Sequence, residues 1–363
     1  MNEKSDGNGE KLKAPFVYFG GKRQVADIVW SRLGDVAHFV EPFFGSGAVL
    51  LARPHETRLE TVNDIDGMIC NFWRAVAADP EQVATLCDWP VNEIDLEARH
   101  RWLCTQPGKD AFLERMKNEP DYYDVKRAAW WCWGLCAWIG TGWCSGEYFP
   151  DAREDSHGRV VCEGANKLPS LGRGMGVHRQ LPSLGNGGQG VHKLTAGPLI
   201  EWFQALAARL RRVRVCCGDW ARICTDGATA HGSTVGVFLD PPYSAEAGRT
   251  GDIYRMDTGV VAHEVRDWCI MRTHCEQAKR YRIVLAGYAG EHNVLADEHG
   301  WTCHAWKARG GYANFGSYAN EQGQANAHRE RLWFSPTCLR PQDEDGAQGE
   351  LFAVGRDLSE ARL

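Results

Sequence analysis

Residues 39–48, Phe-Val-Glu-Pro-Phe-Phe-Gly-Ser-Gly-Ala, decide the fold class of this 363-residue chain. A short apolar run, residues 36–40, leads into them and predicts a strand. Gly45 and Gly47 then let the backbone turn and approach a ligand closely, because glycine adopts positive φ angles without steric cost. Residues 48–52 predict a helix. Strand, glycine turn and helix in this order are typical of an α/β fold.

An acidic residue, Asp64, follows at the end of the next predicted strand, and residues 68–77 continue as a helix. In a doubly wound sheet, the carboxyl ends of successive strands face the same crevice, where a carboxylate can hold ribose hydroxyls. The glycine turn and Asp64 together therefore indicate a site for a nucleotide-like cofactor. The phosphate-loop pattern GxxxxGK[ST] does not occur in the chain, so a triphosphate site has little support.

The motif Asp240-Pro241-Pro242-Tyr243 ends a further apolar run, residues 235–239. It suits a flat base that carries an amine, whose nitrogen is a poor nucleophile because its lone pair is delocalised into the ring. Asp240 and a neighbouring backbone carbonyl can accept the two N–H groups, which frees the lone pair. The prolines direct that carbonyl, and Tyr243 can stack on the base. Because the glycine turn is also present, a role in methyl transfer explains this motif better than a plain Asp-Pro turn does.

The chain divides by composition into one α/β domain in two pieces and three other regions. We expect a disordered lead, an α/β domain, an insert and a weakly ordered tail, at residues 1–13, 14–78 with 198–335, 79–197, and 336–363. Within the insert, residues 128–138 contain four tryptophans and predict a buried helix, with a base-stacking platform as the alternative.

A repeated segment, Leu-Pro-Ser-Leu-Gly at residues 168–172 and 181–185, lies in the second half of the insert. Its glycines indicate an irregular loop. Residues 164–200 contain no Asp or Glu, so Arg173, Arg179 and Lys193 could contact a phosphate backbone. A plain surface insertion explains the segment equally well.

The composition places limits on partners. The formal net charge of −6 argues weakly against nucleic acid, although localised basic residues matter more than the total. No apolar run reaches the ~20 residues that span a bilayer, and the polar N-terminus is unlike a signal peptide, so we expect a cytoplasmic protein without a membrane partner.

The fourteen cysteines contain no CxxC pair. Buried thiols therefore explain them better than a zinc site at Cys144, Cys162 and His157, and no metal is expected.

Four motifs resemble the Dam-type class of DNA N6-adenine methyltransferases. Phe19-Gly20-Gly-Lys22 is similar to the N-terminal GGK element, and Phe43-Phe-Gly-Ser-Gly47 to the loop that binds S-adenosylmethionine. Asn63-Asp64-Ile-Asp66 is similar to the ribose-binding turn, and Asp240-Pro-Pro-Tyr243 to the catalytic motif. The resemblance covers residues 14–77 and 199–335. It implies a Rossmann-like, S-adenosylmethionine-dependent methyltransferase sheet with a helical, loop-rich target-recognition insert.

The resemblance also implies residue roles. It assigns catalysis to Asp240, Pro241, Pro242 and Tyr243. It assigns cofactor binding to Phe19, Gly20, Lys22, Phe43, Gly45, Gly47, Asp64, Asp219 and Trp220. The implied reaction is site-specific methylation of an adenine flipped out of double-stranded DNA, in settings such as restriction–modification. Methylation of RNA or of another amino-bearing base is one alternative, and a non-catalytic DNA-binding protein on the same fold is another.

Overall fold

A computed structural model describes the chain in several stretches. These are residues 12–16, 22–105, 109–119, 121–138, 143–144, 153–154, 160–161, 190–191, 196–229, 232–243, 260–306 and 328–340. Several sequence predictions lie outside the described residues. They concern Phe19, Gly20, His157, Cys162, Arg173, Arg179, Lys193 and the repeated Leu-Pro-Ser-Leu-Gly segment.

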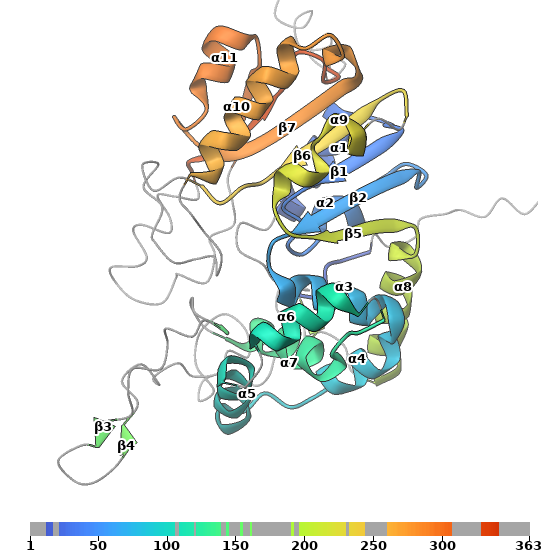
Figure 1. The fold of residues 1–363 in the computed structure, drawn as a ribbon, viewed down its shortest axis with the longest axis vertical. Coiled ribbons are helices and arrows are strands. Elements are labelled where there is room, and N and C mark those ends of the chain that lie inside the picture. Colours follow the sequence, from blue (N-terminus) through green and yellow to red (C-terminus); the bar gives the residue numbers. More distant parts are fainter. Residues whose placement is uncertain are drawn as a thin grey trace, which may run out of the picture.

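The described strands form one large sheet, in the order β5-β2-β1-β6-β7-β9-β8 (Figure 1). Its members are β1 (His38–Glu41), β2 (Leu59–Asp64), β5 (Val213–Cys217), β6 (Val235–Leu239), β7 (Tyr281–Tyr288), β8 (Thr302–Ala305) and β9 (Glu330–Phe334). A separate short pair joins β3 (Arg153–Glu154) to β4 (Val160–Val161).

The sheet is doubly wound. Strands β5, β2, β1, β6 and β7 are parallel, whereas β9 runs antiparallel to both β7 and β8. The chain builds outward from β1 through β2 to β5, then returns to the other side of β1 with β6 and β7. The order of strands therefore reverses between β1 and β6, where open α/β sheets bind their ligands. This topology confirms the predicted α/β fold.

Helices complete the α/β pattern. They are α1 (Ala26–Leu33), α2 (Ala48–Leu51), α3 (Gly67–Ala78), α4 (Pro80–Cys87), α5 (Glu93–Thr105), α6 (Lys109–Asn118), α7 (Val125–Ala137), α8 (Ala196–Leu210), α9 (Asp226–Thr229), α10 (Val261–His274) and α11 (Asn293–His299). Short 3-10 turns are η1 (Lys22–Gln24), η5 (Trp220–Ile223) and η6 (Ala278–Arg280). None of the described helices has the length and apolar character that crossing a bilayer requires.

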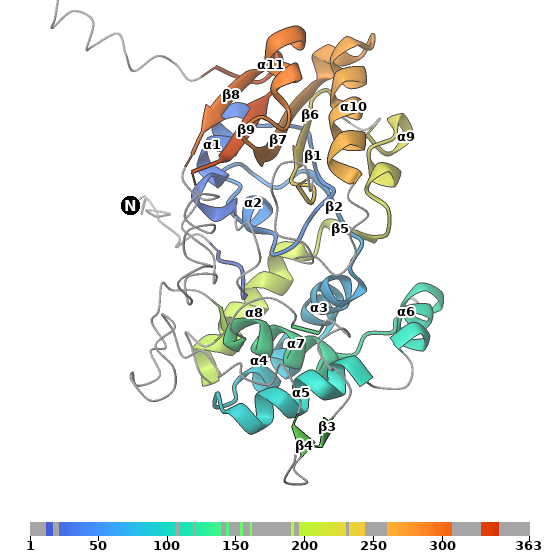
Figure 2. The same ribbon diagram turned by 90° about the vertical axis from the view of Figure 1, so that its left-hand side faces the viewer.

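Two hydrophobic cores cover the two faces of the sheet. Successive strand side chains point to opposite faces, so Phe39 and Phe238 join one core while Val40 and Val237 join the other. The first core includes residues of α1, α3, α7 and α8, and the second includes residues of η5, α10 and α11. The result is a sheet between two helical layers, with α3 to α7 gathered toward its β5 end (Figures 1 and 2).

The tryptophan-rich run is a buried helix, α7, as predicted. Asp124 caps its first turn by accepting a hydrogen bond from the Arg127 backbone N–H at 2.8 Å. Trp131 and Trp133 are buried, and Trp131 contacts the ring of Phe72 in α3. Trp131 therefore anchors the insert to the helical layer of the sheet.

Lys22, the last residue of the GGK element, lies in a short turn ahead of the first α-helix. The described chain begins this segment with the short 3-10 turn η1, and α1 begins only at Ala26. Lys22 is buried within η1, so the turn carries its amine toward the edge of the sheet rather than into solvent.

Candidate active site

Polar side chains gather where the parallel strands end. Asp219 follows β5, Asp240 follows β6, and Tyr288 ends β7. The other strand ends bring Asp64, from β2, and Glu41, from β1. Because β9 is antiparallel, its first residue, Glu330, reaches the same edge as a register partner of Tyr288. One edge of the sheet thus carries almost all of the described residues that the sequence predicted.

Hydrogen bonds with α3 and β2 hold the loop after β1 in place. The Phe44 N–H donates to the Asn63 carbonyl at 2.9 Å, and the Trp73 indole donates to the Gly45 carbonyl at 3.2 Å. Gly47 has φ +67°, and a Cβ there would lie 2.7 Å from the Phe44 ring. The glycine is therefore required by both the backbone conformation and the available space.

Asp64 holds this loop to β2. Its Oδ2 accepts from the Gly45 N–H and its Oδ1 from the Asp66 N–H, each at 2.9 Å. Burial raises the pKa of Asp64 to about 7, although both N–H groups act in the opposite direction. The carboxylate is therefore both a support for the glycine loop and a group that titrates near neutral pH.

Asn63, within β2, joins the loops that follow two other strands, β1 and β5, a role that sequence reasoning missed. Its side-chain amide donates to the Pro42 carbonyl at 3.1 Å and to the Gly218 carbonyl at 2.9 Å. Since Pro42 follows β1 and Gly218 follows β5, one buried amide sets the spacing between both loops and β2. The available signal was its place beside Asp64 in a strand buried on both faces.

An aromatic pair flanks the β5 side of this edge. The rings of Phe43 and Trp220 are stacked, with centroids 6.1 Å apart and an angle of 29° between planes. Trp220 is buried and meets Trp268 of α10 edge-on. Asp219 is exposed, and its carboxylate accepts from the Ala221 N–H at 2.9 Å, capping η5. The structure therefore brings the four predicted positions Phe43, Asp64, Asp219 and Trp220 to neighbouring strand ends.

Lys22 pairs with the predicted catalytic carboxylate. Its Nζ lies 2.9 Å from Asp240 Oδ1 and 3.9 Å from Glu330 Oε2. The Lys22 side chain is only 4% exposed and that of Asp240 16% exposed. A weakly solvated ion pair of this kind needs further hydrogen bonds to be stable.

Tyr243 supplies those bonds. Its hydroxyl lies 2.8 Å from Glu330 Oε2 and 3.3 Å from Asp240 Oδ1, so its one O–H can donate to either acid, and the shorter distance favours Glu330. Its ring meets Tyr288 edge-on at 4.5 Å. Sequence reasoning missed Glu330 and Tyr288, because neither belongs to a motif and only the pairing of β7 with β9 brings them here.

Burial and ion pairing act in opposite directions on the pKa values of Asp240, Glu330 and Lys22. Burial raises the pKa of Asp240, and the opposing effect of the Lys22 ammonium is smaller. Burial likewise raises the pKa of Glu330, again against Lys22. Burial alone would lower the pKa of Lys22, but the two carboxylates outweigh it and the pKa is raised. Lys22 therefore stays charged and favours the ionised form of both acids.

Glu41 is a fifth acidic group at this edge and was not predicted as a site residue. Burial, then the nearby Asp240, raises the pKa of Glu41 well above its usual value. Among the described residues, its Oε2 has no hydrogen-bond partner. A buried acceptor without a donor is costly, so this oxygen is suited to a ligand that brings one.

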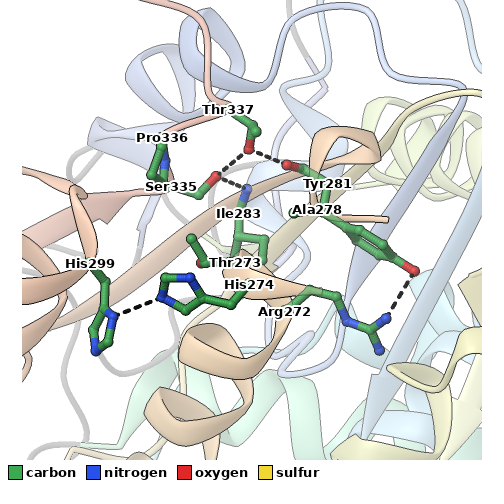
Figure 3. Close-up of a pocket in the computed structure, with 10 residues that line it drawn as sticks. All are labelled: Arg272, Thr273, His274, Ala278, Tyr281, Ile283, His299, Ser335, Pro336 and Thr337. Atoms are coloured by element: carbon green, nitrogen blue, oxygen red, sulfur yellow. Dashed lines mark hydrogen bonds between the residues drawn. The ribbon is translucent and has the colours of Figure 1, made fainter. Parts of the chain in front are cut away.

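A pocket of about 220 Å³ lies at the opposite edge, beside the start of β7 (Figure 3). Tyr281 and Ile283 line it together with a histidine pair, His274 and His299, whose ring nitrogens are 2.9 Å apart. It shares no residue with the cluster around Asp240. The described residues contain no group of three or more His, Cys, Asp or Glu side chains placed so that they could hold a metal ion.

Residues 18–129 match the family model of the D12 class N6 adenine-specific DNA methyltransferases. The match includes Lys22, the glycine loop and Asp64, and ends within α7. It confirms the resemblance to a Dam-type class and supports adenine-specific DNA methyl transfer as the general function. A search among curated proteins gave no match.

Proposed function

We propose that this protein transfers a methyl group from S-adenosylmethionine to the N6 amine of adenine in DNA. The observation that carries the proposal is the meeting of the glycine loop, Asp64, Trp220 and the Asp240–Tyr243 motif at one edge of the sheet. This edge spans the point where the strand order reverses, the usual ligand site of open α/β sheets.

The residues fit S-adenosylmethionine, which would supply the methyl group. The unpartnered oxygen of Glu41 can accept from the ammonium of its methionine part. Asp64 can accept from the ribose hydroxyls, since its two present hydrogen bonds leave further lone pairs. Phe43 and Trp220 offer an aromatic surface for the adenine ring, with Asp219 at its margin. Phe19 and Gly20 remain predicted contacts.

Asp240 is positioned to receive the target amine. Lys22 contacts Oδ1, so an N–H of the amine would bond to Oδ2 while the Pro241 region contributes a backbone carbonyl. The Lys22 ammonium favours the ionised carboxylate, the better acceptor, against the larger effect of burial. Tyr243 and Pro242 complete the wall against which the base would lie. Alignment of the amine, rather than strong base catalysis, is the main contribution of these residues.

An adenine inside a duplex cannot reach a buried carboxylate. The proposal therefore includes extrusion of the base from the helix into the Asp240 site. Arg173, Arg179 and Lys193 remain the proposed contacts to the phosphate backbone, which is consistent with a segment that lacks acidic residues.

Nucleoside mass spectrometry tests the reaction after incubation with S-adenosylmethionine and unmethylated duplex DNA. We expect N6-methyladenine from the wild-type protein and from Asp267→Asn, an exposed control on α10, and none from Asp240→Ala. Cofactor affinity of Asp240→Ala, measured by calorimetry, should stay close to wild type.

Two other outcomes would overturn the proposal. Methylation of structured RNA in preference to DNA would make RNA the substrate. Binding of DNA with no methyl transfer to any base would instead support a non-catalytic DNA-binding protein.

A further inference from the structure

Two cysteines meet beside the proposed cofactor site, one from α3 and one from the end of β5. Cys70 lies in the first part of α3 and is buried, whereas Cys217 is the last residue of β5 and is exposed. Cys70 Sγ donates to the backbone carbonyls of Asp64 and Cys216, which are the register partner and the chain neighbour of Cys217. A buried thiol therefore lies beside an exposed one, an arrangement that suits reversible oxidation.

The contact follows from the fold. Asp64 and Cys217 are register partners in the parallel pair of β2 and β5. Cys70 Sγ lies 3.5 Å from the Asp64 carbonyl oxygen and 3.6 Å from the Cys216 carbonyl oxygen. Side chains alternate along β5, so Cys217 shares the face of Val213, which packs against the core that contains α3. The Cys217 side chain is thereby directed toward the helix that carries Cys70.

The two thiols differ in reactivity. The hydrogen bond from Cys70 lowers the pKa of Cys217, and burial acts against that effect. The same bond, then burial, raises the pKa of Cys70 well above its usual value. The thiolate therefore forms on the exposed residue, and the thiolate is the nucleophilic form of cysteine.

We propose that Cys70 and Cys217 form a reversible disulfide under peroxide and that this bond weakens binding of the cofactor. In the first step the Cys217 thiolate attacks a peroxide oxygen, the O–O bond breaks, and a sulfenic acid forms with release of water or hydroxide. Cys70 then loses its proton and attacks the sulfenic sulfur. The S–S bond forms, and hydroxide leaves as water. A dithiol reductant returns both thiols by exchange.

The effect on the cofactor rests on the proposed function. A disulfide bond has a fixed length of about 2.05 Å and a restricted dihedral angle, so it would tie the end of β5 to α3 in one geometry. The next residue, Gly218, donates its N–H to the Asp64 carbonyl at 2.9 Å and accepts from Asn63 at 2.9 Å. Asp219 and Trp220 follow directly. Movement of Cys217 into that geometry therefore displaces the aromatic and acidic groups proposed to surround the adenosine.

The experiment uses the full chain in reduced form and after treatment with hydrogen peroxide. Free thiols are blocked with N-ethylmaleimide, and peptide mass spectrometry maps the disulfide bonds. Calorimetry then measures affinity for S-adenosylmethionine in both states. We expect a Cys70–Cys217 link and about tenfold weaker cofactor binding after oxidation, both reversed by dithiothreitol.

Matched variants make the result specific. Cys70→Ser and Cys217→Ser should lose the link and the peroxide effect on affinity, while Cys303→Ser, which removes an exposed thiol on β8, should keep both. Absence of the link in wild type would overturn the proposed pair. A link that leaves cofactor affinity unchanged would overturn the switch. Failure of the reduced protein to bind S-adenosylmethionine would instead overturn the proposed function. The two outcomes are distinguishable, because peptide mapping of the disulfide does not require cofactor binding.

Discussion

At the scale of single residues, Lys22 is the main group that opposes the effect of burial on the pKa of the proposed catalytic carboxylate. It is the cation that Asp240 and Glu330 share, and burial of both acids would otherwise favour their protonated forms. Neither acid is adjacent to Lys22 in the chain. The short turn η1, β6 and β9 together place three charges around one hydroxyl, that of Tyr243.

We expect Lys22→Met to move the acid limb of the pH–activity profile to higher pH. Without the ammonium, the raised pKa of Asp240 loses the effect that opposes burial, so the carboxyl group stays protonated to higher pH. Profiles of kcat/KM for methyl transfer measure the shift. Lys22→Arg is the control and should keep the limb near its wild-type position. An unchanged limb in Lys22→Met would show that Asp240 does not titrate in the measured step.

Asp64 predicts a second pH effect, on cofactor binding. Its pKa of about 7 means that the accepting carboxylate forms between pH 6 and 8, so affinity for S-adenosylmethionine should rise with pH across this range. Calorimetry at several pH values tests this, and Asp64→Asn should bind more weakly with little dependence on pH. If the affinity of the wild-type protein for S-adenosylmethionine changed with pH as little as that of Asp64→Asn, the proposed role of Asp64 in binding the cofactor would be contradicted.

The same pKa has the opposite effect on stability. Between the ordinary value of 3.8 and about 7, the folded protein keeps a proton that the unfolded chain has lost. The free energy of unfolding should therefore fall as pH rises through this window, and urea titrations should find a smaller fall in Asp64→Asn.

Sequence reasoning named candidate site residues that the structure places at strand ends. Asp64 and Asp240 are examples, because an apolar run that ends in a carboxylate is visible in the sequence. Glu330 could not be found this way, since it lies 87 positions from Tyr243 and meets it only through the pairing of β9 with β7. Asn63 was visible but had no role until the carbonyls of Pro42 and Gly218 were known to flank it.

At the scale of elements, the β1–α2 junction depends on one glycine. Gly47 adopts φ +67°, and a Cβ there would meet the Phe44 ring at 2.7 Å. We expect Gly47→Ala to lower the free energy of unfolding by about 1–2 kcal/mol, the usual cost of a left-handed conformation for other residues. Urea unfolding measures this loss, and calorimetry should find weaker binding of S-adenosylmethionine.

Gly227→Ala is the matched control for that variant. Gly227 lies in α9, and a Cβ there would have no heavy atom within 4 Å. Alanine should be tolerated at this position or slightly stabilise the helix. Equal losses in both variants would mean that the left-handed turn is not the cause.

Local sequence patterns predict where a strand lies in the chain but not which strands it pairs with. The apolar run at residues 235–239 is the fully buried strand β6, because its residues suit the centre of a sheet. No sequence motif predicted how β8 and β9 pair. β9 inserts between β7 and β8, and such pairing depends on contacts far apart in the sequence, which propensity does not contain.

At the scale of the whole molecule, the insert and the α/β domain share a core. Trp131 of α7 meets Phe16 edge-on at 5.0 Å and lies 5.9 Å from Phe72 of α3. The same cluster continues to Phe203 in α8 and to Phe39 in β1. The predicted domain boundaries stay a prediction, but these contacts make α7 part of the support beneath the glycine loop, because Phe72 neighbours Trp73, which bonds to Gly45.

Trp131→Ala should therefore affect the entire protein. Removing a buried tryptophan typically lowers the free energy of unfolding by about 3–5 kcal/mol. We expect one urea transition, shifted to lower concentration by the same amount whether followed by far-UV circular dichroism or by loss of S-adenosylmethionine binding. Ile94→Ala, on the exposed side of α5, is the control and should change little. Two transitions, with cofactor binding kept through the first, would mean that the insert unfolds as an independent domain and that α7 does not support the site.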